Sequence, residues 1–154
     1  MQLGDFLDFD AISTRLSGGN KRSLLQQLAN LAGQRLGVDS PAILASLTER
    51  EQLGSTGFGQ GVAIPHGKIE GLNRIYGMFS RLAEPIDFKA IDGKPVDLVF
   101  LLLSPPDAGA EHLKALAAVS RLVRHGATVE KLRGARSRDA LAAVIIGAEE
   151  RDAA

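Results

Sequence analysis

The sequence contains three histidines, and His66 has the surroundings best suited to a reaction. It lies in the run Ile64-Pro65-His66-Gly67, directly after a short apolar segment and a glycine-rich stretch. Proline fixes the backbone before the ring, and Gly67 leaves room for another backbone or a phosphate to come close. A histidine placed in this way is exposed and stiffly held, as a reactive imidazole requires. The alternative from these residues alone is a surface histidine in a tight turn.

His112 and His125 lie at the two ends of a predicted helix over about 110–124. His112 is in the first turn, where the helix dipole favours a neutral ring and free N–H groups can bind an anion. The alternative is that His112 only packs at the helix edge above Leu116. His125 precedes Gly126, the expected C-cap, so we predict that it complements the negative end of the helix.

Arg50 precedes a glycine-dense stretch, 54–61, in which Ser55 and Thr56 lie, and four glycines in eight residues predict an irregular segment that is neither a stable helix nor a stable strand. Taken alone, Arg50 is expected to be a solvated cation near a helix end, and Ser55 and Thr56 are expected to be turn residues. The stretch precedes a strand and lacks the spacing of a dinucleotide-binding or P-loop motif. The sequence has no G-x-S-x-G elbow, and no two histidines are close enough along the chain to suggest a local metal site.

Segments of helical and strand character alternate along the chain. The expected helices are 20–37, 40–54, 110–124, 129–132 and 137–149. The expected strands are 11–16, 62–64, 75–82, 86–88 and 96–104. The strand at 96–104 is almost continuously apolar, which indicates burial on both faces and a central place in a sheet. We therefore predict a single α/β domain over 1–154, with a mixed central sheet flanked by helices on both faces.

The composition narrows the class of protein further. The chain has 154 residues, with 18 Lys and Arg against 18 Asp and Glu, so its formal net charge is zero. This balance argues against nucleic-acid binding and against binding to a membrane surface. The absence of cysteine excludes disulfides, thiolate metal sites and cysteine nucleophiles, and it fits a reducing cytoplasm. We expect no targeting segment, no membrane insertion and no metal or organic cofactor.

The stretch from Arg50 to Gly67 resembles the phosphorylation-site signature of phosphotransferase system (PTS) IIA domains of the fructose/mannitol/nitrogen-regulatory type. An acidic residue, then Phe-Gly, then Val-Ala-Ile-Pro-His-Gly follow one another at the spacing of that family. The later run Glu111–Leu116 is similar to the second histidine helix of the family. The resemblance extends along nearly the whole chain, and it is strongest to the nitrogen-regulatory branch.

The resemblance implies a role for each matching position. His66 matches the histidine that accepts a phosphoryl group from a small HPr-like phosphocarrier protein (NPr type). His112 matches a second active-site histidine, and Arg50 matches an arginine that approaches the phosphate. Ser55 and Thr56 match hydroxyl-bearing residues of the adjoining loop. We therefore expect residues 50, 66 and 112 to converge at one edge of the sheet.

This resemblance makes a cytoplasmic phosphoryl carrier with regulatory output the first hypothesis. Its phosphorylation state would signal to target proteins in nitrogen, potassium or envelope regulation. Two alternatives stay open. One is a sugar-specific PTS IIA component that passes phosphate to a IIB domain, and the other is a binding module that transfers no phosphate.

Overall fold

Strand β6 (Val96–Ser104) lies at the centre of the sheet in a computed structural model that describes residues 1–153. Strand β5 (Tyr76–Ile86) pairs antiparallel with one side of β6. The other side of β6 pairs in parallel first with β3 (Val62–Ala63) and then with β4 (His66–Lys68). β1 (Ser13–Leu16) lies parallel to β5, and β2 (Gly57–Gly59) lies antiparallel to β3. The predicted mixed sheet is therefore confirmed.

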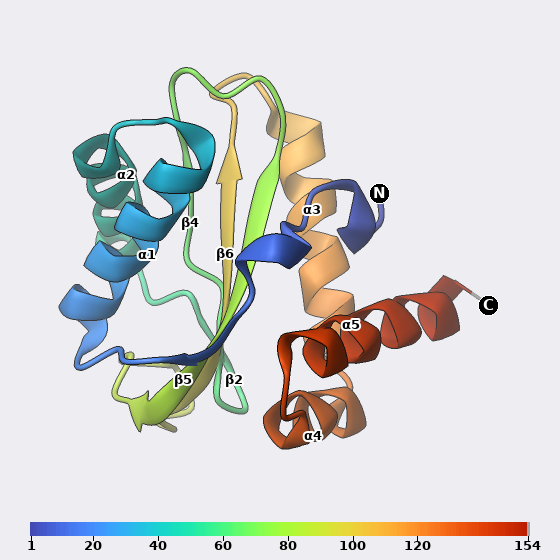
Figure 1. Cartoon of the computed structure of the whole chain (residues 1–154). Coiled ribbons are helices and arrows are strands. Elements are labelled where there is room, and N and C mark those ends of the chain that lie inside the picture. Colours follow the sequence, from blue (N-terminus) through green and yellow to red (C-terminus); the bar gives the residue numbers. More distant parts are fainter. Residues whose placement is uncertain (154) are drawn as a thin grey trace.

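Helices cover both faces of this sheet (Figure 1). On one face lie α1 (Lys21–Leu36) and α2 (Ser40–Gln52), and on the other lie α3 (Gly109–Val123), α4 (Gly126–Gly134) and α5 (Arg138–Ala153). Alternate residues of β6 enter the two resulting cores. Leu98, Phe100 and Leu102 join the core under α3–α5, while Val99, Leu101 and Leu103 join the core under α1 and α2. Burial of both faces explains why this strand is so apolar.

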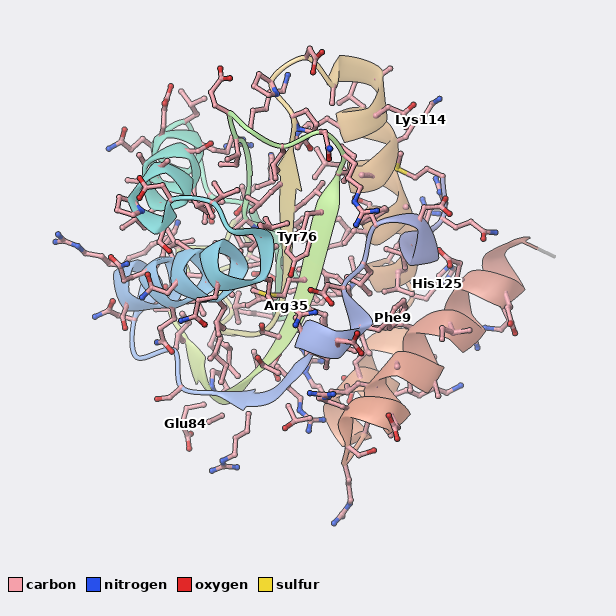
Figure 2. All side chains as sticks on the ribbon, turned by 45° about the horizontal axis from the view of Figure 1, so that its top comes forward. Phe9, Arg35, Tyr76, Glu84, Lys114 and His125 are labelled. Carbon is pink, nitrogen blue, oxygen red and sulfur yellow. The ribbon has the colours of Figure 1, made fainter. Side chains whose placement is uncertain are left out.

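The N-terminal segment is tied to the rest of the fold by Asp8. It includes two short 3-10 helices, η1 (Leu3–Asp5) and η2 (Phe9–Ala11). The Asp8 carboxylate accepts hydrogen bonds from Nε and Nη2 of Arg35 at 2.9 and 3.1 Å and from the Tyr76 hydroxyl at 2.7 Å. Figure 2 shows Arg35 and Tyr76 close together, and this cluster joins α1, β5 and the N-terminal segment.

The predicted range of the first helix, 20–37, is confirmed at both ends of α1. The Asn20 side chain accepts a hydrogen bond from the Ser23 N–H at 2.8 Å, as an N-cap does. Gly37 ends the helix with φ of +67°, the left-handed conformation that glycine adopts at no steric cost. Within residues 1–153, no helix is both long enough and apolar enough to cross a membrane.

The structure corrects the glycine-dense stretch, which was expected to be irregular. Gly57–Gly59 forms β2, in a hairpin with β3. The turn uses positive φ at Gln60 and Gly61, and a Cβ at Gly57 would lie 2.6 Å from the Cβ of Ala90. Close packing therefore requires glycine here, even though glycine has little intrinsic preference for strands.

Two further expectations about element boundaries are wrong. The segments 75–82 and 86–88 were expected as two strands, but β5 runs through Tyr76–Ile86 with a shift of register against β6. Gly126 is the first residue of α4 and does not cap α3, whose C-cap is Arg124. His125 is the N-cap residue of α4, and it lies at the far end of α3 from Lys114 (Figure 2).

Ser80 on β5 is fully buried, and its hydroxyl has no hydrogen-bond partner in the described part of the chain. We expect Ser80→Ala to raise the free energy of unfolding by roughly 1 kcal/mol, because it removes an unpaired buried polar group. Urea denaturation followed by circular dichroism measures this change. As a contrast, Ser137→Ala removes a hydroxyl that accepts the Ala140 N–H, and it should be destabilising. A loss of stability in Ser80→Ala would contradict the prediction.

Candidate active site

His66 is the first residue of β4, beside the carboxyl-terminal half of β6. Pro65 interrupts the chain between β3 and β4, yet both strands pair with β6. Nδ1 of His66 lies 2.7 Å from the carbonyl oxygen of Ile64. Because a carbonyl oxygen can only accept, Nδ1 must carry the proton. In the neutral ring, Nε2 is then the nitrogen with the free lone pair.

His112 comes to the same place from the other side of β6. It lies in the first turns of α3, and its Nδ1 is 2.5 Å from the hydroxyl oxygen of Ser104, the last residue of β6. The ring centroids of His66 and His112 are 5.5 Å apart, and the rings are inclined by 50°. The strand order therefore brings together two histidines that are far apart in the sequence.

Both histidines line a groove of about 390 Å³ that also contains Arg50 and Lys68. Arg50 is in the last turn of α2, and its Nη1 donates to the Gly54 carbonyl at 3.0 Å. Lys68 follows His66 by two residues on β4, so both side chains are on the same face of the strand. Residues 50, 66 and 112 thus converge as expected, in a groove with two cationic side chains. The remaining lining residues are Ser46, Glu49, Leu53 and Gly67.

The environment favours neutral rings at both histidines. Burial lowers the pKa of His66 below its ordinary value and the positive charge of Arg50 lowers it further, while the hydrogen bond to Ile64 and the negative charge of Glu51 act in the opposite direction. Burial also lowers the pKa of His112, and the positive charges of protonated His66 and of Lys68 add to this effect. A neutral imidazole has a lone pair available, so these shifts prepare the site for nucleophilic chemistry.

We expect the pKa of His66 to lie below its ordinary value of 6.5. An NMR titration of the ring protons measures it directly. Because Arg50 opposes protonation, Arg50→Gln should raise the pKa of His66 toward the ordinary value. For the same reason, the stability contributed by the neutral ring is present above pH 6.5 and is lost as the pH falls below it. A midpoint above 6.5 in the unmodified protein is the result that contradicts this expectation.

Ser55 and Thr56 lie outside the groove and shape the loop beside it. The Ser55 hydroxyl donates to the carbonyl of Phe88 at 3.1 Å and accepts the N–H of Gly57 at 3.1 Å. The N–H of Thr56 donates to both carboxylate oxygens of Glu51, at 3.0 and 3.1 Å, and the Thr56 hydroxyl also donates to Glu51. The hydroxyls therefore serve internal contacts in this structure.

Glu51, Lys68 and Ser104 belong to the surroundings of the site, although sequence reasoning gave them no role there. The side chain of Glu51 is only 6% exposed, and its Oε2 is 3.4 Å from Nζ of Lys21. It connects α2, α1 and the loop that follows Arg50. Two features of the sequence could have indicated these residues: Lys68 follows His66 by two positions, and Ser104 is the last residue of the central strand.

Gly67 is buried where β4 passes α2, and its close neighbour there is Ser46 of the same chain. A Cβ at position 67 would lie 3.1 Å from the Cβ of Ser46 and still nearer its Oγ. Ser46 Oγ also donates to the Lys68 carbonyl at 3.0 Å. The absence of a side chain at Gly67 thus lets α2 pack directly on the strand that carries His66.

We expect Gly67→Ala to lower the free energy of unfolding by about 2 kcal/mol, because the added methyl group overpacks this contact. Denaturant unfolding of the unmodified protein, the two single variants and the double variant measures this cost in a double-mutant cycle. In the Ser46→Ala background the closest clash is gone, so Gly67→Ala should cost less there. Equal costs in the two backgrounds would show that Ser46 is not the limiting contact.

No group of three potential metal-binding side chains is found among the residues that the structure describes. The groove combines two imidazoles whose surroundings favour the neutral form with the cations of Arg50 and Lys68 and the carboxylate of Glu49. Such a set can attack an electrophile with a ring nitrogen and can stabilise an anionic group at the same place.

Comparison with known proteins identifies the family of the chain. Residues 5–147 match the family described as the phosphoenolpyruvate-dependent sugar phosphotransferase system, EIIA 2. The chain is 47% identical over 145 residues to a nitrogen regulatory protein of Bradyrhizobium diazoefficiens, covering 94% of this chain and 95% of the relative. It is 38% identical over 141 residues to a fructose-specific PTS EIIA component of Haloferax volcanii, covering 88% and 92%.

A solved structure shows the same fold throughout. The crystal structure of the nitrogen regulatory protein IIA-Ntr from Neisseria meningitidis superimposes with a TM-score of 0.87 at 36% identity, covering 93% of this chain and 98% of that one. The predicted fold class and the resemblance read from Arg50–Gly67 are both confirmed by these comparisons. The chain belongs to the PTS EIIA 2 family, and among its relatives are proteins named as nitrogen regulators.

Proposed function

We propose that this protein is a phosphoryl carrier whose phosphorylation state regulates other proteins. In this proposal, Nε2 of His66 accepts the phosphoryl group from an HPr-like phosphocarrier of the NPr type. The observation that carries the proposal is the hydrogen bond from Nδ1 of His66 to the Ile64 carbonyl. It leaves the Nε2 lone pair available in a groove that also contains Arg50 and Lys68.

The step balances without an additional reactant. The lone pair of Nε2 forms the new N–P bond, while the P–N bond of the phosphorylated donor breaks and its electron pair returns to the donor nitrogen. The proton on Nδ1 stays in its hydrogen bond to the Ile64 carbonyl. No base has to act on His66 first, because the attacking nitrogen carries no proton when the ring is neutral.

The groove supplies the electrostatics that phosphoryl transfer requires. In the loose transition state, negative charge is spread over the phosphoryl oxygens, so positioning and cationic groups do most of the work. The guanidinium of Arg50 can hold two of these oxygens at once, and Lys68 provides a second positive charge. His112 can donate a hydrogen bond from the opposite side of the groove.

The surface around the groove suits brief contact with a donor protein. Leu53 lines the groove with 82% of its surface exposed, and Leu113, next to His112, is 66% exposed. Exposed apolar side chains of this kind favour a protein contact. A carrier must release its partner after each transfer, so we expect a transient interface below about 1,200 Å².

The output of the carrier follows from the charge that it gains. Transfer of PO3⁻ to a neutral ring that keeps its Nδ1 proton adds about one negative charge, and it places anionic phosphoryl oxygens among the cationic side chains of the groove. Target proteins in the cytoplasm can distinguish the two forms by this change of charge. The nitrogen-regulatory names of the relatives support regulation as the output.

The test is incubation with a phosphorylated HPr-like donor, followed by intact-mass measurement of this protein. We expect the mass to increase by one phosphoryl group, and tandem mass spectrometry should place it on His66. A carrier must also return the group, so adding unphosphorylated donor should restore the original mass. An unchanged mass in the presence of an active donor would contradict the proposal.

Two alternatives predict different results in the same assay. The likeness to a fructose-specific component favours a sugar-specific IIA protein, which would pass its phosphoryl group rapidly to a IIB domain of that type. A binding module would gain no mass and would bind its partner equally well with and without the donor. Addition of a fructose-type IIB domain to the phosphorylated protein separates the regulator from the sugar-specific component.

A further inference from the structure

The side chain of Ser104 has one described hydrogen-bond partner, His112. Its Oγ lies 2.5 Å from Nδ1 of His112, and the residue is fully buried at the end of β6. The backbone carbonyl of Ser104 is used separately, since it accepts the N–H of Ile69 at 2.8 Å. The hydroxyl therefore has one place to donate its proton within the described chain, which is Nδ1 of His112.

The direction of this hydrogen bond decides which nitrogen of His112 carries the proton. If Nδ1 donated to Ser104, the buried hydroxyl proton would have no acceptor. If the hydroxyl donates to Nδ1, its proton is satisfied and only an acceptor position on the oxygen is left unused. An unpaired buried donor is the more costly of the two, so donation from Ser104 is favoured. The ring proton of neutral His112 must then be on Nε2.

We infer that Ser104 is a positioning residue that fixes the tautomer of His112, so that Nε2–H of this ring donates to the phosphoryl group on His66. The inference rests on the proposed function, because the acceptor is the phosphoryl group. With Nδ1 directed to the buried end of β6, Nε2 is the nitrogen of His112 left to face the groove. Its centroid is 5.5 Å from that of His66, which is close enough for both rings to contact one small anion.

The two histidines would then have opposite roles set by their neighbours. A backbone acceptor keeps the proton of His66 on Nδ1 and leaves Nε2 as the nucleophile. A side-chain donor keeps the proton of His112 on Nε2 and makes that nitrogen a hydrogen-bond donor. No proton has to move between the rings as the N–P bond forms. Donors fixed in advance at the place where charge develops are the most effective form of electrostatic stabilisation.

The first test determines the tautomer of His112 directly, in ¹⁵N-labelled protein without any phosphoryl donor. Two-bond ¹H–¹⁵N spectra at about pH 8, where neutral rings predominate, distinguish a protonated ring nitrogen from one with a lone pair. We expect His112 to show a lone pair at Nδ1 and a proton at Nε2, and His66 to show the reverse pattern. A protonated Nδ1 in neutral His112 would overturn the inference directly, without any variant.

The second test asks whether the tautomer matters for transfer. Ser104→Ala should shift the two His112 nitrogen signals toward each other, as expected for a mixture of tautomers, and should lower the rate of phosphorylation about tenfold. Ser104→Thr keeps the hydroxyl and should restore both. In a His112→Gln background, Ser104→Ala should have no further effect on the rate. Unchanged spectra and rate in Ser104→Ala would refute the positioning role.

Ser80→Ala is the matched control, because Ser80 is also fully buried but its hydroxyl forms no hydrogen bond with either histidine. It should leave the His112 spectrum and the rate as they are in the unmodified protein. The two proposals fail in different ways. If the protein accepts no phosphoryl group, the proposed function fails, while the donor-free spectra still decide the assignment of the hydrogen bond. If Ser104→Ala does not fold, the His112 spectra of the unmodified protein and of Ser104→Thr still test the assigned tautomer.

Discussion

His66→Gln is expected to abolish acceptance of the phosphoryl group, with no added mass detectable after incubation with a phosphorylated donor. Glutamine fills a similar volume but has no nitrogen lone pair that can attack phosphorus. The loss should therefore be complete, and it should not arise from unfolding. Intact-mass measurement over a time course, with circular dichroism to check the fold, provides the readout.

The matched control is His125→Gln, which makes the same substitution at the N-cap of α4, away from the groove. It should leave phosphorylation unchanged. His112→Gln should retain the site of modification, because His66 is intact, but should react more slowly. A phosphoryl group found on His66→Gln at the normal rate would place the acceptor elsewhere and end this account of the site.

Arg50→Gln is expected to lower the rate of phosphorylation about 10²–10³-fold, the cost of losing one strong donor to a developing negative charge. Two effects oppose each other in this variant. The loss of the guanidinium removes a group that grips the phosphoryl oxygens, but it also makes His66 easier to protonate. Well above pH 6.5 the ring is mainly neutral in either case, so the first effect should dominate there. Rapid-quench measurement of phosphorylation at about pH 8 isolates it.

Arg50→Lys retains the charge but lacks the planar fork, so its rate should fall between those of the unmodified protein and Arg50→Gln. Arg22→Gln is the matched control, since Arg22 is an exposed arginine on α1 outside the groove. Its rate should be unchanged. If Arg50→Gln reacts as fast as the Arg22→Gln control, the phosphoryl group is not stabilised by Arg50.

The arrangement of layers and the convergence of the site could be predicted from the sequence. The almost continuously apolar run at 96–104 indicated the central strand, and Asn20 and Gly37 indicated the ends of the first helix. The convergence of Arg50, His66 and His112 was expected from the resemblance of Arg50–Gly67 and Glu111–Leu116 to the family. The sheet and the helix bounds depend on local pattern and on general rules of topology, so one sequence was sufficient for them.

The features that were missed depend on contacts between distant residues. Gly57–Gly59 forms a strand by pairing with β3, and Ala90 leaves no room for a side chain at Gly57; no local propensity indicates either contact. Gly67 was expected to leave room for a ligand, but Ser46 of the same chain occupies that space. The link from Ser104 to His112 spans a strand end, a loop and a helix start, and its hydrogen bond is visible only in three dimensions.

The contact that orients His66 has a consequence for how the protein can change over evolutionary time. Its oxygen comes from the main chain at position 64, and every amino acid supplies that atom. Replacement of Ile64 can loosen the packing but cannot delete the acceptor. The hydroxyl at position 104, in contrast, is lost in nearly any single substitution. A single substitution can therefore remove the contact that orients His112 far more easily than the contact that orients His66.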